Sequence, residues 1–268
     1  MQFPQEGVAQ NSHPSDTLKV TSYNIRNAKA KDKKNSWKYR CPGTILMLKD
    51  QLPDVIGVQE AFESQVSYID QYLKEYNWYG VGRNNGKRRG EHTAIFYNTK
   101  RIRMEEHGTF WLSGRPEKPT RGWDGLCKRT ATWAVMTHLG SGKRFMVINT
   151  HLDHVGKRAR VKGLELVARF IEEKNTDGLP VVLMGDFNVP LKDKCLQPLE
   201  GKMIPVREAA QVTDSLPSFH GWGKDAQTID YIYESGFSEI NKFKTITKKY
   251  GEWKFISDHY PISTWLVF

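Results

Sequence analysis

Several features that would place the protein in a membrane or among disulfide-stabilised secreted proteins are missing from the sequence. No stretch approaches the about 18 consecutive apolar residues that a membrane span needs, so we expect no transmembrane segment. Three cysteines, far apart and without metal-ligand spacing, argue against a disulfide framework. The first sixteen residues are polar and contain no apolar signal core. They predict a flexible lead and leave the compartment open, cytoplasmic or exported.

Interdomain linkers, internal repeats and low-complexity tracts are missing as well. The 268 residues include 38% hydrophobic and 12% aromatic residues, which is enough for a packed core. We therefore expect one soluble domain, residues 17–268, that is a monomer.

Positive charge, in contrast, is abundant. The formal net charge of +10 suits polyanionic partners such as nucleic acid, anionic lipid or phosphorylated small molecules. Two segments concentrate this charge, residues 29–40 and 83–89, and Trp37 and Tyr39 stand among the basic residues of the first. We expect both segments to contact the substrate backbone. The alternative, solvated loops, stays open because charge alone does not identify a nucleic-acid site.

The pattern of apolar residues predicts both helices and strands. Helices fit residues 42–52, 64–74 and 157–174, the second with Ser64 as its N-cap. Several predicted strands follow one another without a helix, which excludes a simple doubly wound sheet. Two sheets packed face to face, with helices outside, fit better. The predicted strands are 17–24, 54–59, 92–97, 102–112, 129–138, 144–151, 180–186, 228–233 and 261–268.

In five places polar residues stand where an apolar run begins or ends, and in a sixth the Asp230 carboxylate stands inside an apolar run, where an unpaired charge would be costly. A single cluster of this kind is as often a surface turn as a site. Six clusters together predict one convergent polar site at a common edge of the sheets, where many α/β enzymes place their chemistry. The six clusters are Tyr23-Asn24, Gln59-Glu60, Asn149-Thr150-His151, Gly185-Asp186-Phe187-Asn188, Ile229-Asp230-Tyr231-Ile232 and Ser257-Asp258-His259.

In this order the clusters resemble the motifs of the endonuclease/exonuclease/phosphatase superfamily of metal-dependent phosphoesterases, which includes deoxyribonuclease I, apurinic endonucleases, deadenylases, neutral sphingomyelinases and inositol polyphosphate phosphatases. The resemblance runs from Leu18 to Phe268, and residues 90–97 and 108–113 are similar to a bacterial branch near the deadenylase-like members. It implies an α+β fold, the four-layer α/β/β/α sandwich of deoxyribonuclease I, with the site at one end.

The chemistry of phosphodiesters dictates what such a site must supply. Their negative charge repels hydroxide, so a catalyst must neutralise that charge, activate a water and protonate a leaving oxygen. Hard oxygen ligands that bind Mg²⁺ or Mn²⁺ meet the first need. We predict Glu60 and Asp258 as metal ligands and Asn24 as a neutral helper, which are also the roles that the resemblance implies. The sequence places no protein cation beside Glu60 or Asp258.

Five further residues are predicted to act on the substrate. Asp186 orients or deprotonates the attacking water, and Asn188 donates to the phosphoryl oxygens. His259 and Asp230 form a pair in which the carboxylate fixes the tautomer of the imidazole. His151 contacts the phosphate or helps to protonate the leaving group. Which histidine gives the proton, and how many metals act, stay open.

Three residues are predicted to bind substrate, and two more could supply further ligands. Arg129 resembles a phosphate-contacting arginine, whereas His92 and His220 resemble positions near the pocket in this branch. Asp153 and His154 extend the histidine motif.

We predict a metal-dependent phosphodiesterase whose substrate is nucleic acid, that is, a nuclease. Arg26 stands where apurinic endonucleases carry an additional acidic residue, which disfavours repair of abasic sites. One alternative is a hydrolase of non-nucleic phosphoesters such as inositol phosphates or sphingomyelin. Another is a catalytically inactive nucleic-acid-binding module, which would not need Asp186, Asp258 and His259 together.

Overall fold

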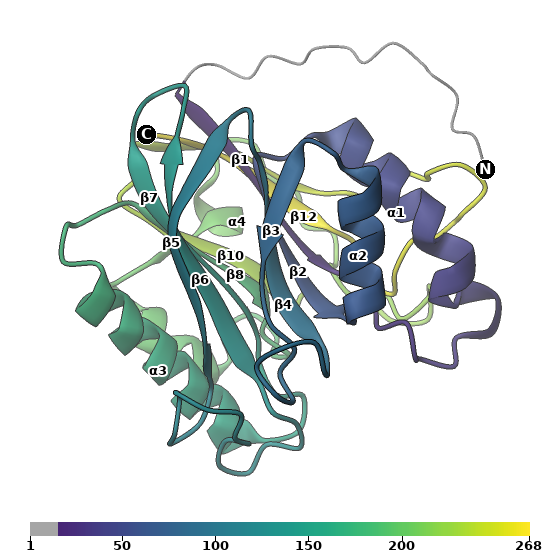
Figure 1. The fold of residues 1–268 in the computed structure, drawn as a ribbon. Helices are drawn as coiled ribbons and strands as arrows, with labels where there is room; N and C mark the ends of the chain where they lie inside the picture. Colours follow the sequence, from purple (N-terminus) through teal and green to yellow (C-terminus); the bar gives the residue numbers. More distant parts are fainter. Residues whose placement is uncertain (1–15) are drawn as a thin grey trace.

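The structure, a computed structural model, describes residues 16–268 as two six-stranded β-sheets packed face to face, with helices on both outer faces (Figure 1). The strand order is β11-β12-β1-β2-β4-β3 in the first sheet and β5-β6-β7-β8-β10-β9 in the second. The predicted four-layer architecture is therefore confirmed. The predicted flexible lead, apart from Asp16, lies outside the described residues. The strands are β1 (Thr17–Asn24), β2 (Val55–Ala61), β3 (Tyr76–Tyr79), β4 (His92–Asn98), β5 (Ile102–Trp111), β6 (Thr130–His138), β7 (Arg144–His151), β8 (Val181–Asp186), β9 (Ile204–Pro205), β10 (Asp230–Ser235), β11 (Glu239–Thr245) and β12 (Ile262–Val267).

Three apolar clusters fill the three interfaces between the four layers. Residues such as Val20, Val147 and Ile232 face one another between the two sheets. The outer face of the first sheet is covered by α1 and α2, and that of the second by α3 and η2. Both sheets are therefore buried on both faces, which explains why their central strands read as continuous apolar runs.

The helices follow the predicted ranges, with two corrections at their starts. Helix α1 begins at Trp37 rather than at residue 42. The prediction began too late because Lys38 and Arg40 interrupt the apolar pattern of the first turn and because proline ordinarily marks a helix start, as Pro42 does not here. The N-cap of α2 is Phe62 rather than Ser64, and the Phe62 N–H donates to Gln65 Oε1 at 3.1 Å. The helices are η1 (Lys33–Asn35), α1 (Trp37–Gln51), α2 (Glu63–Tyr72), α3 (Lys157–Lys174), η2 (Lys194–Leu199) and α4 (Val206–Ala209). Within residues 16–268, none of them combines the length and the apolar character that crossing a membrane requires.

Two parallel strand pairs bring the polar clusters to one edge of the sandwich. In the first sheet β1 runs parallel to β2, and in the second β7 runs parallel to β8. Asn24, Glu60, His151 and Asp186 consequently stand at or near carboxyl ends that point the same way. Asp230 joins them because antiparallel β10 begins opposite Asp186.

One buried amide joins the two sheets beneath this edge. Asn149 of β7 donates through Nδ2 to the carbonyl oxygens of Val58 and Ala94 in the first sheet, both at 2.9 Å. Its Oδ1 accepts from Gln59 Nε2 at 2.7 Å. Three hydrogen bonds thus fix the distance between the sheets next to the site.

Candidate active site

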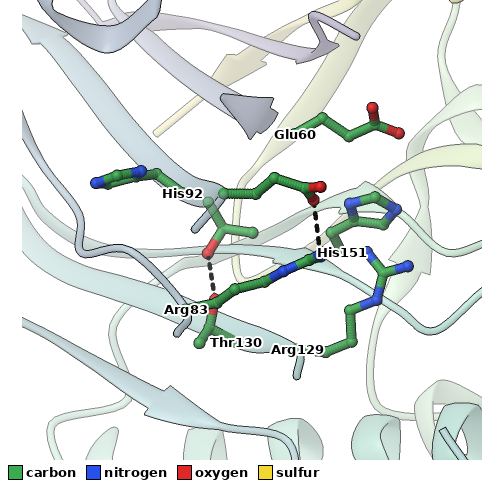
Figure 2. Close-up of a pocket in the computed structure, with 8 residues that line it drawn as sticks. Glu60, Arg83, His92, Arg129, Thr130 and His151 are labelled. Atoms are coloured by element: carbon green, nitrogen blue, oxygen red, sulfur yellow. Dashed lines mark hydrogen bonds and ion pairs between the residues drawn. The ribbon is translucent and has the colours of Figure 1, made fainter. Parts of the chain in front are cut away.

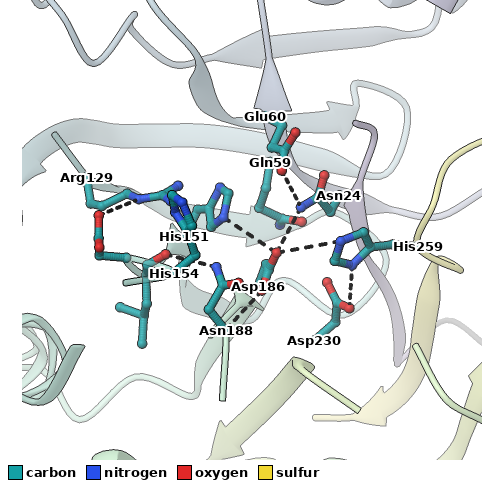
Figure 3. A network of polar contacts seen from close by, with 12 residues as sticks. Asn24, Gln59, Glu60, Arg129, His151, His154, Asp186, Asn188, Asp230 and His259 are labelled. Atoms are coloured by element: carbon teal, nitrogen blue, oxygen red, sulfur yellow. Dashed lines mark hydrogen bonds and ion pairs between the residues drawn. The ribbon is translucent and has the colours of Figure 1, made fainter. Parts of the chain in front are cut away.

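Asp186 lies at the centre of a buried polar network that both sheets build (Figure 3). Its Oδ2 accepts from Asn24 Nδ2 at 2.8 Å and lies 3.5 Å from His151 Nε2. The backbone N–H of Asn188 donates to Oδ1 at 2.9 Å. Burial, and then the nearby Asp230 carboxylate, raise the pKa of Asp186 to about 7. A carboxylate with such a pKa can accept a proton near neutral pH.

His259 and Asp230 form a buried ion pair beside Asp186. His259 Nδ1 lies 2.8 Å from Asp230 Oδ2, and His259 Nε2 lies 3.9 Å from Asp186 Oδ2. Burial alone would lower the pKa of His259, but the carboxylates of Asp230 and Asp186 outweigh it and raise the pKa to about 10. The imidazole is therefore a cation at neutral pH.

His151 has the opposite electrostatic character. Burial, followed by the positive charges of Arg129 and Arg83, holds the pKa of His151 well below its usual value. The two histidines thus differ in charge at neutral pH. His151 offers a neutral ring for hydrogen bonding, whereas His259 offers a positive charge.

The predicted metal ligands lie on the first-sheet side of the network. Glu60 Oε2 accepts from the backbone N–H and from Nδ2 of Asn27, at 3.0 and 2.9 Å, while its Oε1 is only 3.3 Å from Asn24 Nδ2. Burial alone would raise the pKa of Glu60, but the Asn27 hydrogen bonds and the charge of His259 lower it. An ionised carboxylate that hydrogen bonds hold in place suits a hard divalent cation. The residues present therefore fit Mg²⁺ or Mn²⁺.

Asp258 completes this oxygen set but has a protein cation beside it. Its Oδ2 lies 3.4 Å from Arg26 Nη1, so the expectation that no protein cation accompanies the metal ligands is wrong. The carbonyl oxygen of Asp258 accepts from the N–H groups of His220 and Gly221, at 2.9 and 3.2 Å. These contacts fix the segment between β11 and β12 on which Asp258 stands.

Strained backbone accompanies the polar network. Arg26, Glu60 and Asn188 have left-handed backbone conformations, with φ of 53°, 62° and 53°. Each such non-glycine residue costs of order 1–3 kcal/mol and persists only where its surroundings fix it. Gly185, with φ of 152°, approaches β7 so closely that a Cβ would lie 1.9 Å from Thr150 O. The chain thus tolerates unfavourable conformations in order to place these side chains.

Arg129 places unpartnered donors beside Glu60. Its side chain is 95% buried, with Nη2 2.9 Å from His154 Nδ1 and Nε 3.5 Å from an Asp153 oxygen. Within residues 16–268, neither Nε nor Nη1 makes a hydrogen bond. Both Arg129 and Glu60 line a small, partly open pocket (Figure 2). A buried guanidinium with free N–H groups is suited to an anion.

The far wall of this pocket is a second buried ion pair. Arg83 Nη1 lies 2.7 Å from Glu91 Oε2, and both side chains are 15% exposed. Glu91 was not predicted as a site residue, because the Gly82–Glu91 hairpin that places it next to Arg83 has no apolar pattern. The pocket is lined by Glu60, Arg83, Glu91, His92, Thr93, Arg129, Thr130 and His151.

The other predicted substrate residues have contacts of their own. His92 lines the pocket, but its Nδ1 lies 3.1 Å from Ala61 O and its Nε2 3.2 Å from Glu63 Oε2. The ring of His220 stacks between Phe255 and Tyr260, with centroid distances of 4.3 and 4.1 Å. The structure thus places His92 at the pocket and turns the ring of His220 toward its aromatic neighbours.

Asp153, which could have supplied a further ligand, organises a loop instead. It accepts backbone N–H groups from Leu126, Cys127, Val155 and Gly156 at 2.9–3.1 Å. These bonds use both of its oxygens. Asp153, Cys127 and His154 lie close enough to hold a metal, but the saturated carboxylate and the neighbouring Arg129 disfavour one. A second group, Asp186, Asp230 and His259, also has this spacing.

The two basic segments are partly internal, which removes Arg40 and Arg83 from the exposed charge that the segments were predicted to present. Arg40 is 1% exposed and donates to the carbonyl oxygens of Ile25, Arg26, Asn35 and Ile256. Arg83 is paired with Glu91, so neither arginine is a surface charge. The exposed basic residues of these segments are Lys29, Lys31, Lys33, Lys34, Lys38, Lys87, Arg88 and Arg89.

The chain is similar to a known protein family and to several solved structures. The model of the Endonuclease/Exonuclease/phosphatase family matches residues 21–259. Mannosyl-6-phosphatase Bt3783 of Bacteroides thetaiotaomicron VPI-5482 is 32% identical, with a TM-score of 0.89 over 94% of this chain and 100% of that chain. A family protein from Bacteroides vulgatus is also 32% identical, with a TM-score of 0.87 over 93% and 98%. TDP2 of D. rerio, complexed with a single strand DNA product, shares the fold at 18% identity, with a TM-score of 0.75 over 94% and 99%. No curated protein sequence matches the chain.

Proposed function

The chain belongs to the Endonuclease/Exonuclease/phosphatase family, whose enzymes hydrolyse phosphoesters, and from this premise we propose a divalent-metal-dependent phosphatase that removes a terminal phosphate from a small phosphorylated molecule. The observation that carries this proposal is the small, partly open pocket lined by Glu60 and Arg129, where the buried Nη1 of Arg129 makes no hydrogen bond to any residue of the described part of the chain. A small pocket with a buried guanidinium suits the end of a phosphorylated molecule better than the middle of a polymer.

The residues of the network divide the chemistry among them. The Asp186 carboxylate is placed to accept a proton from the attacking water, since its pKa of about 7 lets it act as a base near neutral pH. Charged His259, held by Asp230, stabilises the negative charge that develops on the phosphoryl oxygens. Neutral His151 contributes a hydrogen bond to the same group.

Charge neutralisation completes the mechanism. When bound, Mg²⁺ or Mn²⁺ would be held by Glu60, Asp258 and Asn24 and would act as a Lewis acid on a phosphate oxygen. Arg129 Nη1 is placed to donate to a non-bridging oxygen, where a donor fixed in advance needs little reorganisation. These groups together provide the positive charge that a phosphomonoester dianion requires.

Similarity to Bt3783, described as a mannosyl-6-phosphatase, favours a phosphorylated sugar as the substrate. Nuclease activity, the function predicted from the sequence, is the second candidate. It is favoured by the exposed basic residues Lys87, Arg88 and Arg89 of the hairpin that closes the pocket.

A substrate panel separates the two candidates. The purified chain with Mg²⁺ or Mn²⁺ is offered hexose phosphates, inositol phosphates, an aryl phosphomonoester, an aryl phosphodiester, single-stranded DNA, plasmid DNA and poly(A) RNA. We expect kcat/KM for the best phosphomonoester to exceed that for the aryl phosphodiester by about 100-fold or more. Cleavage of a polynucleotide without phosphate release from any monoester would establish the nuclease instead.

A further inference from the structure

Arg26 occupies an unusual place for a basic residue, directly beside the oxygen set for the metal. Its Nη1 lies 3.4 Å from Asp258 Oδ2. Its Nε and Nη2 bind the two carboxylate oxygens of Asp32, at 3.0 and 3.2 Å. Asp32 thus anchors one edge of the guanidinium, and the edge that carries Nη1 points to Asp258.

The backbone of Arg26 is fixed as firmly as its side chain. The residue has a left-handed φ of 53°, and its N–H donates to Asn24 Oδ1 at 3.0 Å. Its carbonyl oxygen accepts from Arg40 Nη2 at 2.7 Å and from Gln65 Nε2 at 2.9 Å. A non-glycine residue is held in this conformation only when its surroundings over-determine it, and such residues concentrate at functional sites.

Arg26 is also open to an approaching substrate. Its side chain is 31% exposed, whereas those of Asp32 and Asp258 are 10% and 7% exposed. The two carboxylates are therefore more buried than the Arg26 side chain, which is partly exposed to solvent. Arg26 also acts electrostatically on Glu60, the other acidic residue of the metal site.

We propose that Arg26 is a fixed cation of the catalytic centre, which limits the centre to one divalent ion and donates Nη1 to a phosphoryl oxygen of the substrate. The proposal rests on the proposed function for its second part. A second divalent ion among these oxygens would lie close to the Arg26 guanidinium beside Asp258. The two positive charges would repel each other, which disfavours the second ion. Arginine suits the donor role because its planar fork can bind a carboxylate and a phosphate at once.

The test measures metal binding and turnover separately in Arg26→Met. Mn²⁺ binding is followed by electron paramagnetic resonance and calorimetry, and turnover is measured at saturating metal. We expect one Mn²⁺ per wild-type chain. In Arg26→Met, we expect tighter binding or a second equivalent, because the repelling charge is gone, while kcat falls about 10²-fold or more. Arg103→Met removes a cation that is 65% exposed at the opposite end of the sandwich, and should change neither quantity.

The direction of the change in Mn²⁺ affinity distinguishes this role from a structural one. If Arg26 merely positioned Asp258, Arg26→Met would weaken Mn²⁺ binding, and that result would overturn the proposal, as would an unchanged kcat at saturating metal. If Arg26→Met does not fold, Asp32→Asn is the second variant. It leaves the guanidinium charge of Arg26 uncompensated and should therefore weaken Mn²⁺ binding. An unchanged Mn²⁺ affinity in Asp32→Asn would contradict the proposal. If the wild-type chain hydrolyses no phosphoester, the proposed function fails, while the Mn²⁺ titration still decides whether Arg26 limits the centre to one ion.

Discussion

His259 Nδ1 lies 2.8 Å from Asp230 Oδ2, and this contact joins a loop of the first sheet to a strand of the second. Both side chains are almost fully buried. Each partner is therefore costly to leave alone: a buried carboxylate without its imidazolium is unpaired, and an imidazolium without its carboxylate loses its charge.

The pair should consequently behave as one unit in catalysis. His259→Ala and Asp230→Ala should each lower kcat/KM strongly, and the double variant should be little worse than the poorer single variant, because either change already removes the paired cation. Steady-state kinetics of the three variants on the best substrate measures the coupling. Losses that simply add would show that the two residues act independently.

Asp186 should control the lower limb of the pH profile. A base works only when deprotonated, so kcat/KM should rise as the pH rises through about 7, the pKa to which burial and Asp230 bring Asp186. Asp186→Asn should lower kcat by about 10²-fold or more and remove this limb. Near wild-type turnover in Asp186→Asn would assign water activation to another residue.

Metal removal should abolish hydrolysis. Exhaustive treatment with EDTA should stop turnover, and Mg²⁺ or Mn²⁺ should restore it, because the oxygen set of Glu60, Asp258 and Asn24 suits a hard cation. Glu60→Gln should raise the metal concentration needed for half-maximal rate by about tenfold or more. Full activity after chelation, or a Glu60→Gln variant with unchanged metal dependence, would contradict this assignment.

The exposed basic residues of the hairpin should reveal whether nucleic acid is a partner. If it is, replacing Lys87, Arg88 and Arg89 by Ser should weaken binding to long nucleic acids. The slope of binding against salt concentration should fall by about 1 for each phosphate that the variant no longer neutralises. Turnover of a small aryl phosphate should stay nearly unchanged.

A matched triple variant controls for net charge in this experiment. Lys100, Arg103 and Lys143 are exposed at the opposite end of the sandwich. Their replacement by Ser should leave binding intact. Equal effects of the two triple variants would mean that the hairpin has no specific role.

Asn149 should be important for stability rather than for chemistry. Asn149→Leu keeps the number of side-chain heavy atoms but removes the hydrogen bonds to two carbonyl oxygens and to Gln59 Nε2, which should lower the free energy of unfolding by about 3 kcal/mol or more. Asn77→Ala, at an exposed position of β3, should change it by less than about 0.5 kcal/mol. Urea denaturation measures both, and a wild-type value for Asn149→Leu would exclude the proposed tie between the sheets.

Much of the fold could be predicted because its central strands are apolar on both faces. The ranges of β1, β7 and α3 coincide with the predicted ones. Strand β11 was missed, since this edge strand carries Lys242 and Lys244 and a register shift between Ile240 and Lys242 breaks its alternation. The four-residue β3 was missed because it is too short to show a period.

The site was predictable only where polar residues end apolar runs. Asp186 follows this rule, and Asp230, which stands inside an apolar run, meets it across paired strands. The position of Arg26 depends on a left-handed turn and on contacts to residues distant in the sequence, Arg40 and Gln65. No local pattern announces such contacts, so its place beside Asp258 became visible only in three dimensions.

The pairing of β1 with β12 has a consequence for the order of events during synthesis. Strand β1 lies between β2 and β12, so the first sheet is unfinished until β12 has been made. Asp258 and His259 directly precede that strand. A nascent chain that still lacks these two residues can fold the second sheet at most. Asp186 and Asp230 then lack the contact with His259. Enzymatic activity therefore cannot emerge gradually as the chain grows; it begins only when the ribosome has passed β12 and this strand has docked against β1.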